Sequence, residues 1–172
     1  MNIRKATPGD AAGIAKVHVD SWRTTYKNIV PDEFLDSLDY EDRTKRWEEN
    51  VTQSSVYVAE TGDGKIVGFS TGGKERGGKY AGYDGELYAI YIFEEYQGGG
   101  LGKKLVKPIA DELIQDGFKS MLVWVLEDNA AKYFYEKLGG QYIDTTDITI
   151  AGAELKEIAY GWPVLNELAK EG

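Results

Sequence analysis

The chain has 172 residues, a net charge of −9 from 29 acidic and 20 basic side chains, one histidine and no cysteine. This length predicts one domain, residues 1–172, with its own hydrophobic core. The composition excludes disulfides and a thiol nucleophile, and no metal is expected. The acidic balance argues against nucleic-acid binding and favours small cationic partners. Because neither a signal peptide nor a long apolar stretch occurs, we expect a cytoplasmic protein without a membrane partner.

The N-terminal third predicts one strand followed by helices. Residues 2–6 form the strand, and Thr7-Pro8-Gly9-Asp10 then resembles a helix start with a capping-box-like pair. Apolar residues follow at helical spacing from Ala11 to Trp22, and the only histidine, His18, lies among them, so we interpret it as a core histidine. Residues 32–38 predict a helical turn, and Asp39 begins a second, charged helix that reaches about residue 50.

From residue 55 onward the sequence changes to the period of strands. Residues 56–60 and 66–70 predict a hairpin. Residues 72–85 contain six glycines and no periodicity, which predicts a flexible surface loop that could fold over a substrate. Residues 86–93 are apolar on both alternating faces, as in a central strand. Glu86 heads one apolar face, so it is either a functional carboxylate or the exposed end of the strand.

A glycine-rich turn follows this strand and precedes a helix, and it contains Gly98, Gly99, Gly100 and Gly102. Such a turn presents backbone N–H groups at the positive end of a helix dipole, which suits a phosphate. The spacing differs from a Walker A loop, because Lys103 is followed by Lys104 and not by Ser or Thr, and it also differs from a Rossmann fingerprint. An NTP-binding function is therefore disfavoured.

The spacing of Gln97, Gly100 and Gly102 matches Gln-x-x-Gly-x-Gly, and with it the chain resembles the GNAT superfamily of N-acetyltransferases. In that family the loop holds the pyrophosphate of acetyl-CoA. A second segment is similar to the family's other signature, with Asn129 at the start of a short helix that contains Phe134 and Tyr135. The resemblance covers residues 56–160 and implies acetyl-CoA as the co-substrate.

The remaining elements complete the predicted fold. Residues 101–115 form a helix with Pro108 inside it, 119–126 a strand, 130–138 a short helix, and 141–146 and 154–160 a closing pair of strands. The order is βααβββαβαββ. The resemblance implies an α/β (α+β) fold in which helices flank a mixed, mostly antiparallel central sheet.

The resemblance also assigns roles to residues. Tyr135 corresponds to the family's general acid, and Glu86, eleven residues ahead of Gln97, to the general base of several members. No Ser or Cys is placed as a nucleophile, so the amine would attack directly in a ternary complex. The predicted coenzyme contacts are Ile90, Tyr91, Ile92, Gln97, Gly98, Gly99, Gly100, Leu101, Gly102, Lys103, Asn129, Phe134 and Tyr135, with the 90–92 amides facing the oxyanion.

The acceptor is less defined. Trp22, Tyr26 and Tyr88 are candidate contacts for it. Polyamines, aminoglycosides, amino acids and peptide or protein amino groups all remain open, and the acidic charge favours a small cationic amine. A non-catalytic acyl-CoA sensor is the alternative, although such a sensor would need neither Glu86 nor Tyr135. Because the family often dimerises, a homodimer is also considered.

Overall fold

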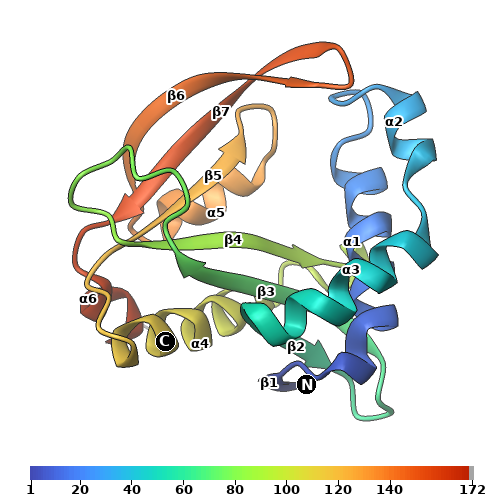
Figure 1. The fold of residues 1–172 in the computed structure, drawn as a ribbon, viewed down its shortest axis with the longest axis horizontal. Coiled ribbons are helices and arrows are strands. Elements are labelled where there is room, and N and C mark those ends of the chain that lie inside the picture. The colour runs from blue at the N-terminus through green and yellow to red at the C-terminus, as the bar shows by residue number, and fades with distance from the viewer. Residues whose placement is uncertain (171–172) are drawn as a thin grey trace.

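The computed structural model describes residues 1–170, and its centre is a seven-stranded sheet in the order β1-β2-β3-β4-β5-β7-β6 (Figure 1). The strands are β1 (Asn2–Lys5), β2 (Ser55–Glu60), β3 (Ile66–Lys74), β4 (Gly85–Ile92), β5 (Met121–Leu126), β6 (Gln141–Ile150) and β7 (Ala153–Trp162). The α-helices are α1 (Ala11–Thr25), α2 (Asp32–Ser37), α3 (Tyr40–Gln53), α4 (Leu101–Gln115), α5 (Ala131–Lys137) and α6 (Leu165–Lys170), with 3-10 turns η1 (Pro8–Asp10) and η2 (Glu94–Tyr96).

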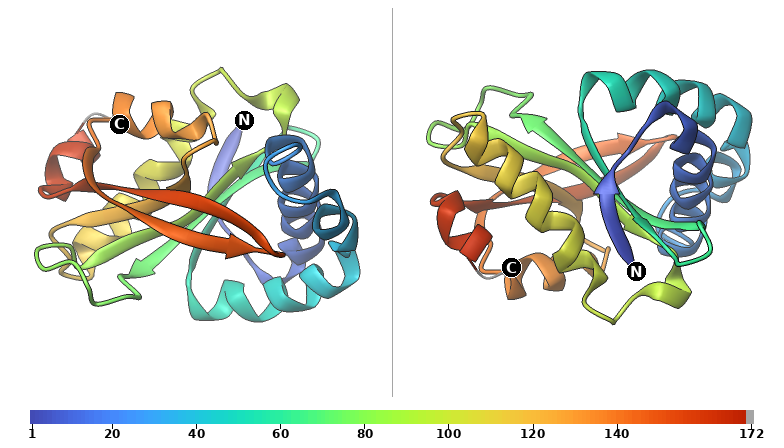
Figure 2. Two further views of the ribbon diagram at one scale, coloured as in Figure 1. Left: turned by 90° about the horizontal axis from the view of Figure 1, so that it is seen from above. Right: turned by 90° about the horizontal axis from the view of Figure 1, so that it is seen from below.

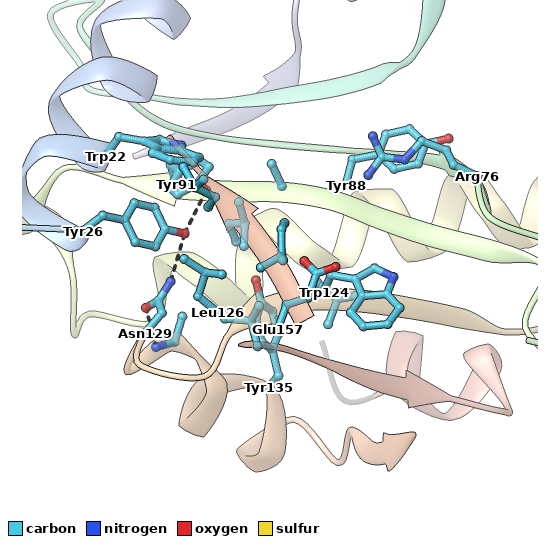
Figure 3. A pocket seen from close by; sticks show the side chains of 17 residues that line it. Trp22, Tyr26, Arg76, Tyr88, Tyr91, Trp124, Leu126, Asn129, Tyr135 and Glu157 are labelled. Carbon is cyan, nitrogen blue, oxygen red and sulfur yellow. Dashed lines mark hydrogen bonds between the residues drawn. The ribbon is translucent and has the colours of Figure 1, made fainter. Parts of the chain in front are cut away.

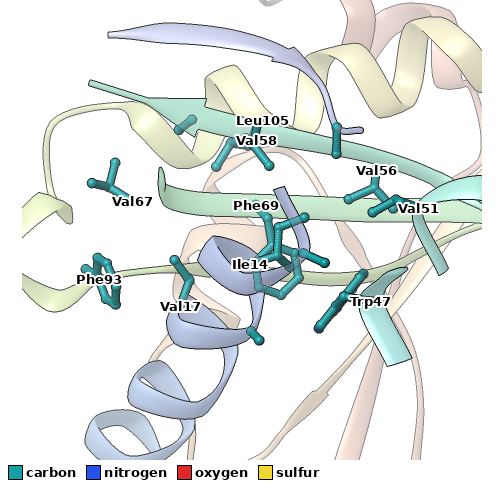
Figure 4. Close-up of a cluster of buried hydrophobic side chains, with 14 of the residues drawn as sticks. Ile14, Val17, Trp47, Val51, Val56, Val58, Val67, Phe69, Phe93 and Leu105 are labelled. Atoms are coloured by element: carbon teal, nitrogen blue, oxygen red, sulfur yellow. The ribbon is translucent and has the colours of Figure 1, made fainter. Parts of the chain in front are cut away.

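Helices cover both faces of the sheet (Figure 2). Helix α1 packs against α3, β3 and β4, whereas α4 packs against β2, β3, β4 and α6. Consecutive residues of β3 show that these are opposite faces: Phe69 lies 4.9 Å from the Trp47 ring of α3, while the Ser70 hydroxyl donates to the Leu105 carbonyl of α4 at 2.7 Å. Figure 4 shows the core cluster around Phe69.

The one parallel pair in the sheet, β4 with β5, is short. Pairing begins at Gly85 with Met121 and ends at Leu87 with Val123, although both strands continue beyond it. Past Leu87, β4 keeps its antiparallel partner β3 as far as Ile92. The edge of β4 that faces β5 is therefore without a strand partner over residues 88–92, and the sheet opens between the two strands.

The mixed, mostly antiparallel fold is confirmed, and the predicted strands and helices occur in the predicted order. The predicted helical turn at 32–38 is the short helix α2, and the C-terminal helix α6 was not predicted. The capping pair is present as well, since the Thr7 backbone N–H donates to the Asp10 carboxylate at 2.8 Å. That turn, however, is 3-10, and α1 begins only at Ala11. Asp39 caps α3 as predicted, because its carboxylate accepts from the backbone N–H groups of Glu41 and Asp42.

Several boundaries were wrong. Strand β3 runs to Lys74 and β4 starts at Gly85, so the predicted loop 72–85 loses both ends to strands. Its middle is held by hydrogen bonds: Glu75 accepts from the backbone of Gly77 at 2.7 Å, and Asp84 accepts from that of Ser120 at 3.0 Å. Strands β6 and β7 are longer than predicted because they pair with each other beyond the edge of β5, as far as Ile150 with Ala153.

Candidate active site

A cavity of about 240 Å³ occupies the opening between β4 and β5 (Figure 3). Its walls come from α1, the β3–β4 loop, β4, β5, the start of α5 and the β6–β7 hairpin. The lining is largely aromatic and aliphatic, with one guanidinium and one carboxylate: Trp22, Tyr26, Arg76, Tyr88, Ala89, Ile90, Tyr91, Val123, Trp124, Val125, Leu126, Asn129, Ala131, Tyr135, Ile148, Ile150 and Glu157. Such a lining suits an organic ligand that is oriented by few polar contacts.

Tyr26 joins three elements at one end of the cavity. Its hydroxyl lies 3.2 Å from the Tyr91 hydroxyl of β4 and accepts from the Asn129 side-chain amide at 3.2 Å. Asn129 in turn accepts from the Ala131 backbone N–H at 2.9 Å, which fixes the first turn of α5. The Trp22 ring packs 4.5 Å from the Tyr26 ring. The predicted residues Trp22, Tyr26, Tyr91 and Asn129 therefore lie together.

Tyr135 lines the same cavity and is 4 % exposed. Burial raises the pKa of its phenol well above 10, so Tyr135 is protonated at neutral pH and can donate a proton. Its ring makes an edge contact with Trp162 at a centroid distance of 6.3 Å. The neighbouring Phe134 lies against Gly102, where a Cβ atom would be only 3.0 Å from the Phe134 ring. The two sequence signatures are thus in direct contact.

The glycine turn leads into α4, a helix of 15 residues. Gly98 and Gly100 have φ of 82° and 83°, which L-residues with side chains rarely adopt. Within residues 1–170, the backbone N–H groups of residues 98–103 donate to no acceptor of the chain. A Cβ atom on Gly98, Gly99 or Gly100 would meet nothing within 4 Å. Open space with unpaired N–H groups at a helix N-terminus fits a phosphate group.

The Gln97 side chain connects this turn to the central strand. Its amide donates to the Ile92 carbonyl at 2.9 Å, at the end of β4. Ile90 and Tyr91 of the same strand line the cavity, in the part of β4 that no longer pairs with β5. Leu101 is the buried first residue of α4, whereas Lys103 in the same turn of the helix is exposed. The predicted coenzyme contacts therefore form a continuous path from the cavity to the start of α4.

Glu86 has a different environment from the one predicted. Its side chain is 3 % exposed and does not line the cavity. Arg76 holds both carboxylate oxygens: the backbone N–H donates at 3.1 Å and Nη2 at 2.8 Å. The interpretation of Glu86 as an exposed strand end is wrong, because a buried carboxylate requires a partner and the β3–β4 loop supplies one.

Arg76 itself does line the cavity, and its guanidinium lies 4.2 Å from the centre of the Tyr88 ring. The sequence analysis missed Arg76, Trp124 and Glu157. A search for a cation to neutralise Glu86 could have found Arg76. Glu157 could have been noted as a carboxylate within the alternating strand 154–160, but only the sheet register shows which way it faces.

None of the helices within residues 1–170 is both long and apolar enough to cross a membrane. In the same residues, no group of three or more His, Asp or Glu side chains is arranged to hold a metal ion.

A sheet that opens beside a turn of N–H groups without acceptors in residues 1–170, with a buried phenol in the opening, is consistent with an acyl-coenzyme A transferase. The sequence matches the acetyltransferase (GNAT) family over residues 17–140, and the chain belongs to this family. It is 43% identical over 168 residues to the uncharacterized N-acetyltransferase YuaI of Bacillus subtilis (strain 168), covering 98% of this chain and 96% of that protein. An acetyl-CoA-dependent N-acetyltransferase, as predicted from the sequence, is thereby confirmed.

Solved structures share the fold. The ribosomal-protein-alanine N-acetyltransferase of Brucella melitensis superposes with a TM-score of 0.74 at 23% identity, over 94% of this chain and 99% of that one. The putative acetyltransferase yncA of Salmonella typhimurium, solved with its cofactor acetyl-CoA, gives a TM-score of 0.70 at 23% identity, over 94% and 92%. At these identities the likeness concerns the fold.

Proposed function

We propose that this protein transfers the acetyl group of acetyl-CoA directly to a primary amine that binds in the aromatic cavity. The observation that carries this proposal is the continuity of the site. The Tyr135 phenol lies in the wall of the cavity between β4 and β5. The helix that bears Tyr135 also contacts the glycine turn before α4, because Phe134 lies against Gly102. One extended ligand can therefore reach both ends.

The turn from Gln97 to Lys103 is proposed to bind the pyrophosphate through its unpaired N–H groups, and the free edge of β4 at Ile90–Ile92 to face the acyl group. Asn129 and Phe134 would contact the coenzyme beside them. When bound, acetyl-CoA supplies the activated acyl group and a sulfur leaving group. Tyr135 donates a proton toward that sulfur, because its buried phenol is neutral at working pH.

The reaction also requires a base for the acceptor amine. A primary amine with a pKa near ~10.4 is protonated at pH 7, and removing the proton costs about 4 to 5 kcal/mol. Glu86 was predicted to accept it, but Glu86 would first have to leave its hydrogen bonds with Arg76. A base already free inside the cavity would avoid that cost.

The acceptor is proposed to be a small cationic amine in contact with Trp22, Tyr26 and Tyr88. Aromatic faces attract an ammonium group, and the net charge of −9 favours its approach. The related Brucella structure is named for a ribosomal-protein alanine, so a peptide amino group is the competing acceptor. A cytoplasmic location and a homodimer stay predictions of the sequence.

The test is release of CoA thiol from acetyl-CoA across a panel of alkylamines, polyamines, amino acids and peptides at pH 7 to 9. Because the chain has no cysteine, a thiol reagent reports coenzyme alone. We expect one amine class to raise release well above the control without amine. Binding of acetyl-CoA without release for any acceptor would contradict the proposal and favour a sensor.

A further inference from the structure

We propose that Glu157 of β7 is the carboxylate that receives the acceptor ammonium and removes its proton. This inference rests on the proposed function and names the base and the charge of the acceptor for that site. Glu86, in contrast, holds Arg76 in place at the edge of the cavity.

The sheet register places Glu157 in the cavity. In β7 it pairs with Leu126 of β5 on one side and with Thr146 of β6 on the other. Directly paired residues share a face of the sheet, and both Leu126 and Glu157 line the cavity. Figure 3 shows the Glu157 carboxylate and the Tyr135 phenol pointing into the same space, from β7 and α5 respectively.

The surroundings of Glu157 differ from those of Glu86. Among the side chains described, those of residues 1–168, Lys and Arg form salt bridges with Glu86 and with Asp147, but none lies within 4.0 Å of Glu157. Its neighbour Lys156 faces the other way and pairs with Asp147 at 2.8 Å. Glu157 therefore has an acceptor oxygen available to a ligand, whereas both Glu86 oxygens are engaged.

Charged and titratable groups face Glu157 from three directions. Arg76 and Tyr80 come from the β3–β4 loop, Glu86 from β4 and Tyr135 from α5. Burial raises the pKa of Glu157, and the negative charge of Glu86 adds to this effect, while the Thr146 hydroxyl and Arg76 oppose it. A raised pKa makes a carboxylate a stronger base, which suits proton removal near neutral pH.

The proton balance is complete with the residues present. Glu157 takes one proton from the ammonium and later releases it to solvent. The freed nitrogen lone pair forms the C–N bond to the acyl carbon, and the C–S bond breaks as Tyr135 donates its proton to sulfur. The second proton that nitrogen loses on becoming an amide restores Tyr135. The net products are the amide, free thiol and one proton.

A binding experiment tests the ammonium site independently of turnover. The probes are 2-phenylethylamine and its uncharged analogue 2-phenylethanol, followed by tryptophan fluorescence at pH 7, because Trp22 and Trp124 line the cavity. We expect Glu157→Gln to weaken binding of the amine about tenfold or more and to leave the alcohol unchanged. No binding of the amine to the wild type, or equal amine affinity in both proteins, overturns the proposal.

The pH dependence of turnover tests the base. For an alkylamine, Glu157→Gln should lower kcat/KM at pH 7 by about 10²-fold or more, and its rate should rise about tenfold per pH unit as free amine accumulates. With an acyl hydrazide as the acceptor, which is already neutral at pH 7, Glu157→Gln should lower kcat/KM much less. Glu86→Gln should keep the shape of the wild-type pH profile. The profile should move toward lower pH, because the negative charge that helps to raise the pKa of Glu157 is removed.

The matched control is Glu154→Gln, an exposed glutamate on the same strand, which should leave every readout unchanged. Acetyl-CoA affinity should be equal in all variants. If Glu157→Gln keeps the wild-type rate and profile while Glu86→Gln loses them, Glu86 is the base and the inference fails. If the wild type acetylates no amine at all, the proposed function itself fails.

Discussion

Tyr135 illustrates how a residue's chemistry depends on its surroundings. Its phenol is in a cavity wall, and burial keeps it protonated because the phenolate would lose hydration. The same burial brings Trp162 and Phe134 against its ring, so its orientation is fixed by packing. A proton donor of fixed direction is what a departing thiolate requires.

Tyr135→Phe should lower kcat by about 10²-fold or more, since only the donated proton is lost, and should leave acetyl-CoA affinity within about twofold. Steady-state thiol release and titration with acetyl-CoA measure the two quantities. Unchanged kcat would remove Tyr135 as the acid. A large loss of coenzyme affinity would instead assign it a binding role.

At the scale of elements, the turn before α4 combines backbone conformation with electrostatics. Gly100 is the N-cap of α4 in the left-handed region, and the following N–H groups are unpaired. The helix dipole adds partial positive charge at this end. The anion affinity that we propose for this turn would therefore come from the backbone, and the absence of side chains on the glycines keeps the space above it open.

Gly100→Val should abolish measurable acetyl-CoA binding, because a branched Cβ is strained at φ 83° and fills the open space over the turn. Gly117→Val is the matched control: Gly117 has φ 91°, open space around it, and lies at the far end of α4. Both variants should lose similar stability in urea unfolding. Equal coenzyme affinity in the two would contradict the assignment of the turn.

A second pair of elements, α1 and α3, is joined by His18. Its Nδ1 accepts from the Trp47 indole N–H at 3.1 Å, and its ring stacks on Tyr91 of the cavity at 5.8 Å. Burial lowers the pKa of His18 to about 4, and the charge of Arg43 acts in the same direction. The core histidine predicted from the sequence is thus packed between α1 and α3 and is neutral at pH 7.

The free energy of unfolding should fall as the pH is lowered from 7 to 5. The unfolded chain binds a proton on His18 below about 6.5, whereas the folded protein does so only near 4, so the difference costs about 2 kcal/mol between pH 7 and pH 5. Urea unfolding at both pH values measures it. In His18→Gln this component should disappear, and an equal pH dependence in that variant would contradict the role of His18.

For the molecule as a whole, the site depends on elements that lie far apart in the chain. The β6–β7 hairpin brings Ile148 and Ile150 to the cavity, which Trp22 of α1 also lines. In Figure 1 the tip of this hairpin lies near α1 and α2. The same residues join the cluster of α1 and α2 that contains Leu35. The hairpin therefore closes one side of the cavity, and the molecule as a whole carries a net charge of −9.

Raising ionic strength from about 20 to 200 mM should lower kcat/KM for a cationic amine about two- to tenfold, because salt screens the field that attracts it. The measurement uses saturating acetyl-CoA, so that screening of the anionic coenzyme does not contribute. An acyl hydrazide serves as the neutral comparison. An equal salt effect on both acceptors would show that the acidic charge does not select cations.

The sequence by itself determined the features that depend on local chemistry. Glycine spacing after an apolar strand predicted the tight turn before α4, and the Asn129 to Gly139 segment predicted the helix that bears Tyr135. Caps at Thr7 and Asp39 followed from side chains that bond to nearby backbone. These interactions span only a few residues, so they can be recognised from the spacing of residues in the sequence.

Only the tertiary structure decided where the carboxylates lie. Glu86 heads an apolar strand, and its partner Arg76 comes from a loop whose sequence shows no periodicity. Glu157 reaches the cavity because β7 inserts beside β5, and a shift of one residue in that register would turn it to the other face. The opening between β4 and β5 likewise arises from pairing between strands 30 or more residues apart, which local patterns do not encode.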